Sequence, residues 1–187
     1  MSRIDVSGRI LDNPQTKEKI TFLKTAEDTN GEYVRMQIVL PPGGHVPMNV
    51  HQAYSEGYEV VNGRLDVAIG EKDNHKVIGA GNKILAEKGI AHHYWNDSQD
   101  PVEFIVEVRP ARQFEKFMRI IVGLGKEGKL NKDGAPKNIF QLAMIVRLSE
   151  AYLHGLPLGL QKFLFDTIIY RLARLFGYSE DFPEYVM

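Results

Sequence analysis

The chain contains no cysteine in its 187 residues. Disulfide bonds, thiolate metal ligands and a cysteine nucleophile are therefore all excluded. Strong charge of either sign is also missing: the net charge is −1, which gives nucleic acid no overall electrostatic attraction. The most apolar stretch, residues 156–178, is interrupted by Lys162, Asp166, Arg171 and Arg174. Such a stretch is typical of an amphipathic helix and not of a membrane span.

The two parts of the chain differ slightly in charge. Residues 1–110 contain 12 basic and 16 acidic side chains, whereas residues 111–187 contain 11 basic and 8 acidic ones. So small a basic excess is typical of a solvated helix surface, and we expect neither nucleic acid nor a membrane as a partner. Residues 1–19 lack the apolar segment of a secretory signal peptide, so a cytoplasmic location is expected.

Up to about residue 110 the sequence is built of short segments rich in β-branched residues, several of which alternate with a period of two. These segments predict strands at 19–25, 32–40, 57–61, 64–70, 75–79, 82–87 and 102–110. Asn62-Gly63 lies between two of them and predicts a hairpin, because both residue types tolerate positive φ. Many strands at short, regular spacing favour a sandwich or a closed barrel.

After Pro110 the hydrophobic period changes to about 3.6 residues. One predicted helix has an apolar face of Phe114, Phe117, Met118, Ile121 and Val122. Two further helices are predicted at 138–153 and 160–177. We therefore expect a mostly β domain over 1–110 and a helical extension over 111–187. The extension packs on the β domain, or on a partner subunit in a homodimer.

Three residues of the β domain, His51, Glu56 and His92, could bind a metal together, with Asn49 beside them. Asn49 and His51 are two positions apart, so both side chains can point to one face of a strand. Glu56 follows a short bend, and His92 opens a later strand that could lie beside the first. Two imidazoles and one carboxylate suit a divalent first-row metal, such as manganese, iron or zinc.

The spacing of these residues resembles the paired motifs of the cupin superfamily. The similarity covers roughly residues 35–110, with an asparagine where the first motif has its first histidine and a glutamate where the second has proline. The matching positions are Gly43, Asn49, His51, Glu56 and Gly63, then Gly81, Glu87, Gly89, His92 and Asn96.

This resemblance implies a small antiparallel β-barrel of jelly-roll type, followed by about three C-terminal helices. It also implies a metal held by up to four side chains, which by position are Asn49, His51, Glu56 and His92. The extension is similar to one found on some uncharacterised cupins. The superfamily includes dioxygenases, isomerases, decarboxylases, storage proteins and sugar-sensing regulators, so the resemblance selects no reaction.

Asn49 has two interpretations. Its neutral amide oxygen could bind the metal directly, which suits manganese better than zinc or iron, or it could orient His51 or a metal-bound water. Neither His45 nor His93 is a good substitute. His45 lies roughly 13 Å from Asn49 along an extended strand, and His93 should face away from His92. Tyr54 is expected to pack in the core, with lining of the pocket as the alternative.

Two functions from different classes follow. In the first, the protein is a metal-dependent enzyme, such as an oxygenase or isomerase, acting on a small molecule. No separate general base is evident in the sequence for this reaction. In the second, it is a non-catalytic barrel that binds or senses a small molecule and has weakened or lost its metal.

Overall fold

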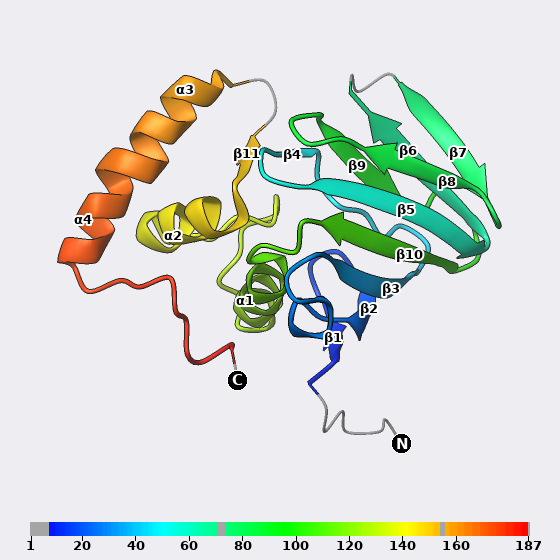
Figure 1. Cartoon of the computed structure of the whole chain (residues 1–187), viewed down its shortest axis with the longest axis horizontal. Helices are drawn as coiled ribbons and strands as arrows, with labels where there is room; N and C mark the ends of the chain where they lie inside the picture. The colour runs from blue at the N-terminus through cyan, green and yellow to red at the C-terminus, as the bar shows by residue number, and fades with distance from the viewer. Residues whose placement is uncertain (1–7, 71–73, 154–155, 187) are drawn as a thin grey trace.

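The computed structural model describes residues 8–70, 74–153 and 156–186. Most of the chain up to residue 110 forms strands that pair antiparallel in two sheets (Figure 1). One sheet has the order β1-β2-β3-β10-β5-β8 and the other β11-β4-β9-β6-β7. The strands are β1 (Ile10–Asp12), β2 (Lys19–Lys24), β3 (Val34–Leu40), β4 (Asn49–His51), β5 (Ser55–Asn62), β6 (Arg64–Ile69), β7 (His75–Gly79), β8 (Lys83–Ala86), β9 (His92–Trp95), β10 (Val102–Arg109) and β11 (Ala151–Leu153).

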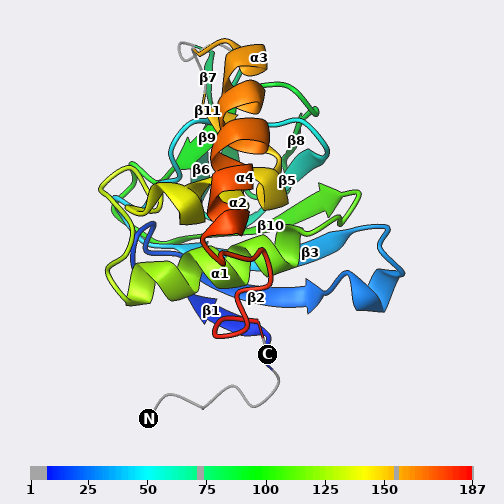
Figure 2. The ribbon, with the colours of Figure 1, turned by 90° about the vertical axis from the view of Figure 1, so that its left-hand side faces the viewer.

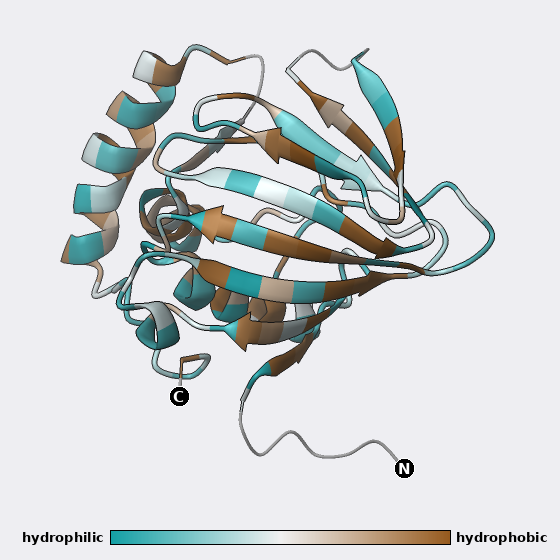
Figure 3. Ribbon diagram, turned by 45° about the vertical axis from the view of Figure 1, so that its right-hand side comes forward, coloured by the Kyte–Doolittle hydropathy of each residue, from teal (hydrophilic) through white to brown (hydrophobic). Residues whose placement is uncertain are grey.

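The hydrophobic core of this β domain lies between the two sheets. In β3 and β10 every second side chain is buried, as the period of a half-buried strand requires. Figure 3 shows this alternation as changes of colour along the strands. Side chains from β2, β3, β5 and β10 of one sheet meet those of β6 and β9 of the other in a single cluster. The mostly β, jelly-roll fold expected from the sequence is confirmed.

The prediction of a hairpin at Asn62-Gly63 is wrong. β5 pairs with β10 and β8, whereas β6 pairs with β9 and β7, so the turn carries the chain from one sheet to the other. Gly63 has a φ of +85°, and a Cβ there would lie 3.2 Å from the carbonyl oxygen of Pro101. The dipeptide therefore marks a tight reversal, but long-range pairing decides which strands become neighbours.

The expected helical extension is present. It contains α1 (Phe114–Lys126), α2 (Ile139–Ser149) and a continuous helical rod made of α3 (Leu158–Gln161), the π-helical η2 (Lys162–Ile169) and α4 (Tyr170–Leu175). A single 3₁₀ turn, η1 (Glu27–Thr29), occurs among the described residues before β3. Asn138 caps α2 by accepting hydrogen bonds from the backbone of Phe140 and Gln141. In Figures 1 and 2, α2 lies between the rod and the β domain.

The second predicted helix is four residues too long. α2 ends at Ser149, Glu150 takes a left-handed conformation with φ +48°, and Ala151–Leu153 form β11. β11 pairs antiparallel with β4, placing Ala151 opposite His51. The unpaired edge of β4 thus overrides the helical periodicity of these three residues, because its backbone groups need hydrogen-bond partners.

A buried cluster joins the extension to the β domain. Ile120 and Leu124 of α1 pack against Met144 and Leu148 of α2. Phe117 packs against this cluster and also against the core between the sheets. Among the described residues, no helix combines the length and apolarity needed to cross a bilayer.

Candidate metal centre

Three strands bring the predicted ligands together. His51 is the last residue of β4, Glu56 the second of β5 and His92 the first of β9. In β5 and β9 the buried positions alternate, so Glu56 and His92 point inward with Tyr58 and Tyr94. All three ligand side chains are at least nine-tenths buried.

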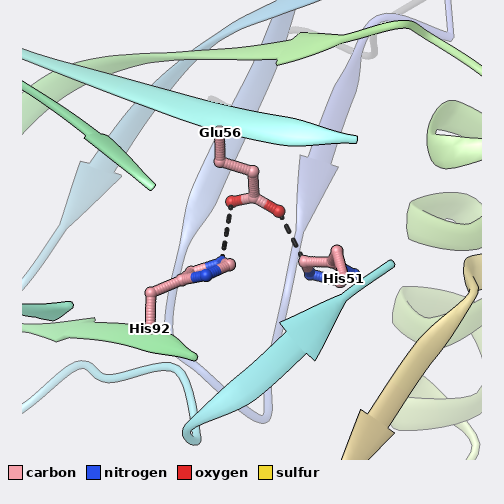
Figure 4. A group of neighbouring side chains, drawn as sticks. All are labelled: His51, Glu56 and His92. Atoms are coloured by element: carbon pink, nitrogen blue, oxygen red, sulfur yellow. Dashed lines mark ion pairs between the residues drawn. The ribbon is translucent and has the colours of Figure 1, made fainter. Parts of the chain in front are cut away.

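Glu56 lies between the two imidazoles. Its Oε1 is 3.1 Å from Nε2 of His51, and its Oε2 is 3.7 Å from Nε2 of His92 (Figure 4). One ligand atom from each side chain lies within 4.8 Å of the others. Tyr58 donates a hydrogen bond of 2.8 Å to Oε2 of Glu56, which fixes the carboxylate from outside the group.

These contacts shift the pKa values of Glu56 and His92. Burial acts to raise the pKa of the Glu56 carboxyl, but the hydrogen bonds and charges of His51 and His92 outweigh it and hold the pKa well below its ordinary value. For His92, burial acts to lower the pKa, but Glu56 raises it overall. Without a metal the Glu56 carboxylate therefore favours the protonated form of His92.

The donor atoms suit a metal ion. Nδ1 of His92 is 2.9 Å from the carbonyl oxygen of Ile90, which leaves its Nε2 directed toward Glu56. His92 Nε2, His51 Nδ1 and Asn49 Oδ1 are buried, and none has a hydrogen-bond partner among the described residues. Buried nitrogen and oxygen atoms without partners are costly. For His92 Nε2 and Asn49 Oδ1 a cation would remove that cost.

Asn49 lies beside the group. It is paired with His92 in the β4–β9 register, so the two side chains project from neighbouring positions on one face. Its Nδ2 donates to the carbonyl oxygen of Pro47 at 3.0 Å, which leaves Oδ1 as the available acceptor.

The other candidates take no direct part. His45 is exposed and bridges to Trp95, while the His93 ring stacks on that of Trp95 at 4.7 Å. Tyr54 is buried outside the cavity lining, as expected for a core residue. Its ring stacks on His51 at 4.4 Å, and its hydroxyl donates to the carbonyl oxygen of Ser149 at the end of α2. Tyr54 therefore holds the His51 ring and ties it to the extension.

A second buried carboxylate, Glu18, was missed by the reasoning from sequence. Its side chain accepts hydrogen bonds from the hydroxyls of Thr16 and Tyr94 and, at 3.5 Å, from the amide of Asn13. Burial raises the pKa of Glu18 despite these donors, and the charge of Glu56 adds to the shift. A buried glutamate just before a strand was the only sequence signal, and it is too common to identify a site.

The three candidate ligands, Asn49 and Glu18 open onto one cavity of about 230 Å³. Glu18, Asn49, His51, Glu56 and His92 lie in its wall together with side chains of α1 and of the loop at 130–135. The extension therefore forms part of the wall next to the three candidate ligands.

Comparisons with known proteins agree with this fold. Residues 36–108 match the family model described as "Cupin domain". This match covers the part of the β domain that holds the two motifs, and it agrees with the cupin resemblance that they indicated.

Several solved structures resemble the chain in part. A predicted oxalate decarboxylase from Thermotoga maritima is 20% identical, with 50% of this chain and 80% of that one covered and a TM-score of 0.47. An uncharacterised conserved protein with a double-stranded β-helix domain from Klebsiella pneumoniae is 19% identical, with 59% and 92% covered and a TM-score of 0.47. A sugar phosphate isomerase of the cupin superfamily from Silicibacter pomeroyi is 17% identical, with 49% and 59% covered and a TM-score of 0.44. No curated protein matches the chain.

Proposed function

We propose that the protein is a metal-dependent enzyme acting on a small molecule. The observation that supports this most is the convergence of two imidazoles and a carboxylate on one point in the wall of a partly open cavity. His51, Glu56 and His92 would hold a divalent manganese, iron or zinc ion, and Asn49 Oδ1 would be the fourth, weaker ligand. Such a set leaves coordination positions open for substrate.

A bound ion would supply Lewis acidity or activate oxygen at this point. The chain's own residues have separate tasks. Glu56 provides the negative charge, Tyr58 and Tyr54 hold the carboxylate and the His51 ring, and α1 excludes water. Glu18 is a buried carboxyl in the same cavity and supplies the acid–base group that the sequence did not reveal.

Metal analysis of protein purified without chelator tests this proposal. We expect close to one equivalent of a first-row metal, lost in His51→Ala and in His92→Ala and retained in His45→Ala. His45 is the matched control because it is exposed and lies outside the group. Metal-free protein in which neither ligand variant changes stability would contradict the proposal.

A non-catalytic binding barrel is the second candidate. The 3.1 Å contact of His51 with Glu56 favours it, because this ion pair can partly satisfy both groups without a metal. The two candidates differ in a measurable way. A binding barrel would keep its small-molecule affinity after chelator treatment, whereas the proposed enzyme would lose both metal and turnover.

We also propose a homodimer. Leu160, Leu164, Ile168, Leu172 and Phe176 recur every four residues along the α3–η2–α4 rod, and each is at least 37% exposed. An apolar stripe of this kind favours association with a second copy. Light scattering should give a dimer for the wild type and a monomer for Leu164→Glu with Leu172→Glu; a monomeric wild type would contradict the proposal.

A further inference from the structure

The cavity next to the three ligands has an apolar wall contributed by the extension. Phe114, Phe117, Met118 and Ile121 of α1 line it, and Leu130 lies in the loop that follows. On the β-domain side Met36, Ile38, Val46 and Val106 continue the same surface. A molecule bound at the metal centre would therefore extend along a largely hydrocarbon wall.

The lining is also without positive charge. No lysine or arginine lines the cavity among the described residues, whereas Glu18, Glu56 and Asp133 do. Phosphate and dicarboxylate groups are normally bound by arginine, lysine or several backbone N–H groups. A doubly charged ligand would lose its hydration here and gain no cationic side chain in return.

The hydroxyl groups of the wall are already engaged. Tyr58 donates to Glu56, and both Thr16 and Tyr94 donate to Glu18. A sugar would bring several hydroxyls into a space with few available partners, and each buried hydroxyl left unpaired costs about 1–3 kcal/mol.

The volume indicates how large a group the cavity can bury. A protein cavity of about 150 Å³ admits benzene. The 230 Å³ present here therefore accommodates one aromatic ring, or a branched aliphatic group of similar size, with a short substituent.

We propose that the ligand is a compound of about this size with an apolar body and a single oxygen-bearing head. The body lies against α1, and the head, which carries at most one negative charge, lies at His51, Glu56 and His92. This inference rests on the proposed metal centre for the position of the head. The apolar body of the ligand is inferred from the apolar wall of the cavity, and this part of the inference does not depend on the metal.

Two hydroxamates test the proposal, because they share one metal-binding head and differ in the body. We expect calorimetry on the full-length, Mn²⁺-loaded protein to show benzohydroxamate binding at least roughly tenfold more tightly than acetohydroxamate, since a phenyl group buries more apolar surface than a methyl group. Equal affinities would overturn the proposal while leaving the metal centre intact.

The Met118→Gln variant tests whether the apolar wall causes the preference for benzohydroxamate. This substitution places a polar amide in the lining with little change of volume. We expect the substitution to weaken the binding of benzohydroxamate several-fold and to leave the affinity for acetohydroxamate unchanged. Leu85→Gln is the control, since Leu85 is 51% exposed on β8 and does not line the cavity. An equal effect of both variants on benzohydroxamate would contradict the assignment to α1.

If the protein binds no Mn²⁺, the proposed function is contradicted. The role of the apolar wall in ligand binding can still be tested. Ligand-detected NMR with phenol on the metal-free wild type should then show binding that Met118→Gln weakens and Leu85→Gln does not. Failure of the wild type to bind phenol, with or without metal, would overturn the proposed ligand class.

Discussion

Glu56 and Glu18 are two glutamates at least nine-tenths buried in the wall of one cavity, and their neighbours differ in charge. Glu56 is placed between His51 and His92, whereas Glu18 is surrounded by neutral hydroxyl and amide donors. Burial acts in the same direction on both. The pKa of Glu18 is raised, and that of Glu56 is lowered because its imidazole neighbours outweigh burial.

The difference shows that burial alone does not decide the charge of a carboxyl group. Imidazole neighbours keep Glu56 ionised, as a metal ligand must be. Neutral neighbours leave Glu18 able to hold a proton at a higher pH. Two carboxyl groups with pKa values driven apart are the usual means by which one site contains both an anion and an acid.

Removing the charge of Glu56 should have the largest effect. Glu56→Gln leaves two imidazoles and no anionic ligand. We therefore expect the affinity for Mn²⁺ to fall by more than roughly 100-fold, which exceeds the loss expected when a residue that only hydrogen-bonds to a ligand is mutated. Calorimetric titration measures this. Glu59→Gln is the matched control, since Glu59 lies on the same strand and pairs with Arg35 and Lys83. An equal effect of both changes would show that Glu56 has no special role.

Acidification should act on the same ligand group. Metal binding requires neutral imidazoles, and the pKa of His92 is raised above its ordinary 6.5 because Glu56 outweighs the effect of burial. Below that raised pKa, protons compete for the site. We therefore expect the Mn²⁺ affinity to begin falling at or above pH 6.5 and then to fall roughly tenfold per pH unit for each proton displaced. An affinity that stays constant down to pH 5 would exclude His92 as a ligand.

The two tyrosines allow the carboxyl groups to be compared directly. Tyr58→Phe removes the hydrogen bond to Glu56 and should weaken Mn²⁺ binding by roughly tenfold. Tyr94→Phe removes the corresponding bond to Glu18 and should leave Mn²⁺ affinity nearly unchanged. Each should lower the free energy of unfolding by about 1 kcal/mol. Metal titration and urea denaturation distinguish these effects, and equal metal affinities in the two variants would count against the separation of roles.

The smallest effect is expected from Glu18→Gln. Because the folded-state pKa of Glu18 is raised, folding retains a proton that the unfolded chain releases near pH 4.3. The stability linked to Glu18 is thus fully present below about pH 4.3 and declines as the pH rises through the folded pKa. In urea denaturation of metal-free protein, the free energy of unfolding of the variant should rise relative to that of the wild type as the pH increases across this range. A difference in unfolding free energy that does not change with pH would mean that the pKa of Glu18 is not raised by folding.

The barrel and the convergence of its three candidate ligands could be predicted because their signals are local. A period of two in a strand fixes which side chains share a face, and the motif spacing places Glu56 and His92 at the start of their strands. Glu18 could not be predicted, since its burial depends on contacts with Tyr94, which lies 76 residues away.

Long-range pairing also explains the other two errors. Asn62-Gly63 specifies a reversal of the chain but not the sheet in which the next strand pairs. Residues 151–153 continue a helical pattern and become a strand only because the edge of β4 is available beside them. In both cases the deciding contact comes from a segment outside the local window.

The pairing of β11 with β4 also has a consequence for the order of folding. The ligand-bearing strand obtains its last neighbour from a segment roughly one hundred residues further along the chain, a separation that slows the formation of such contacts. During synthesis, β4 must therefore remain an open edge until residues 151–153 have left the ribosome. The site next to His51 is therefore completed only after α1 and α2, which precede β11, have been synthesised.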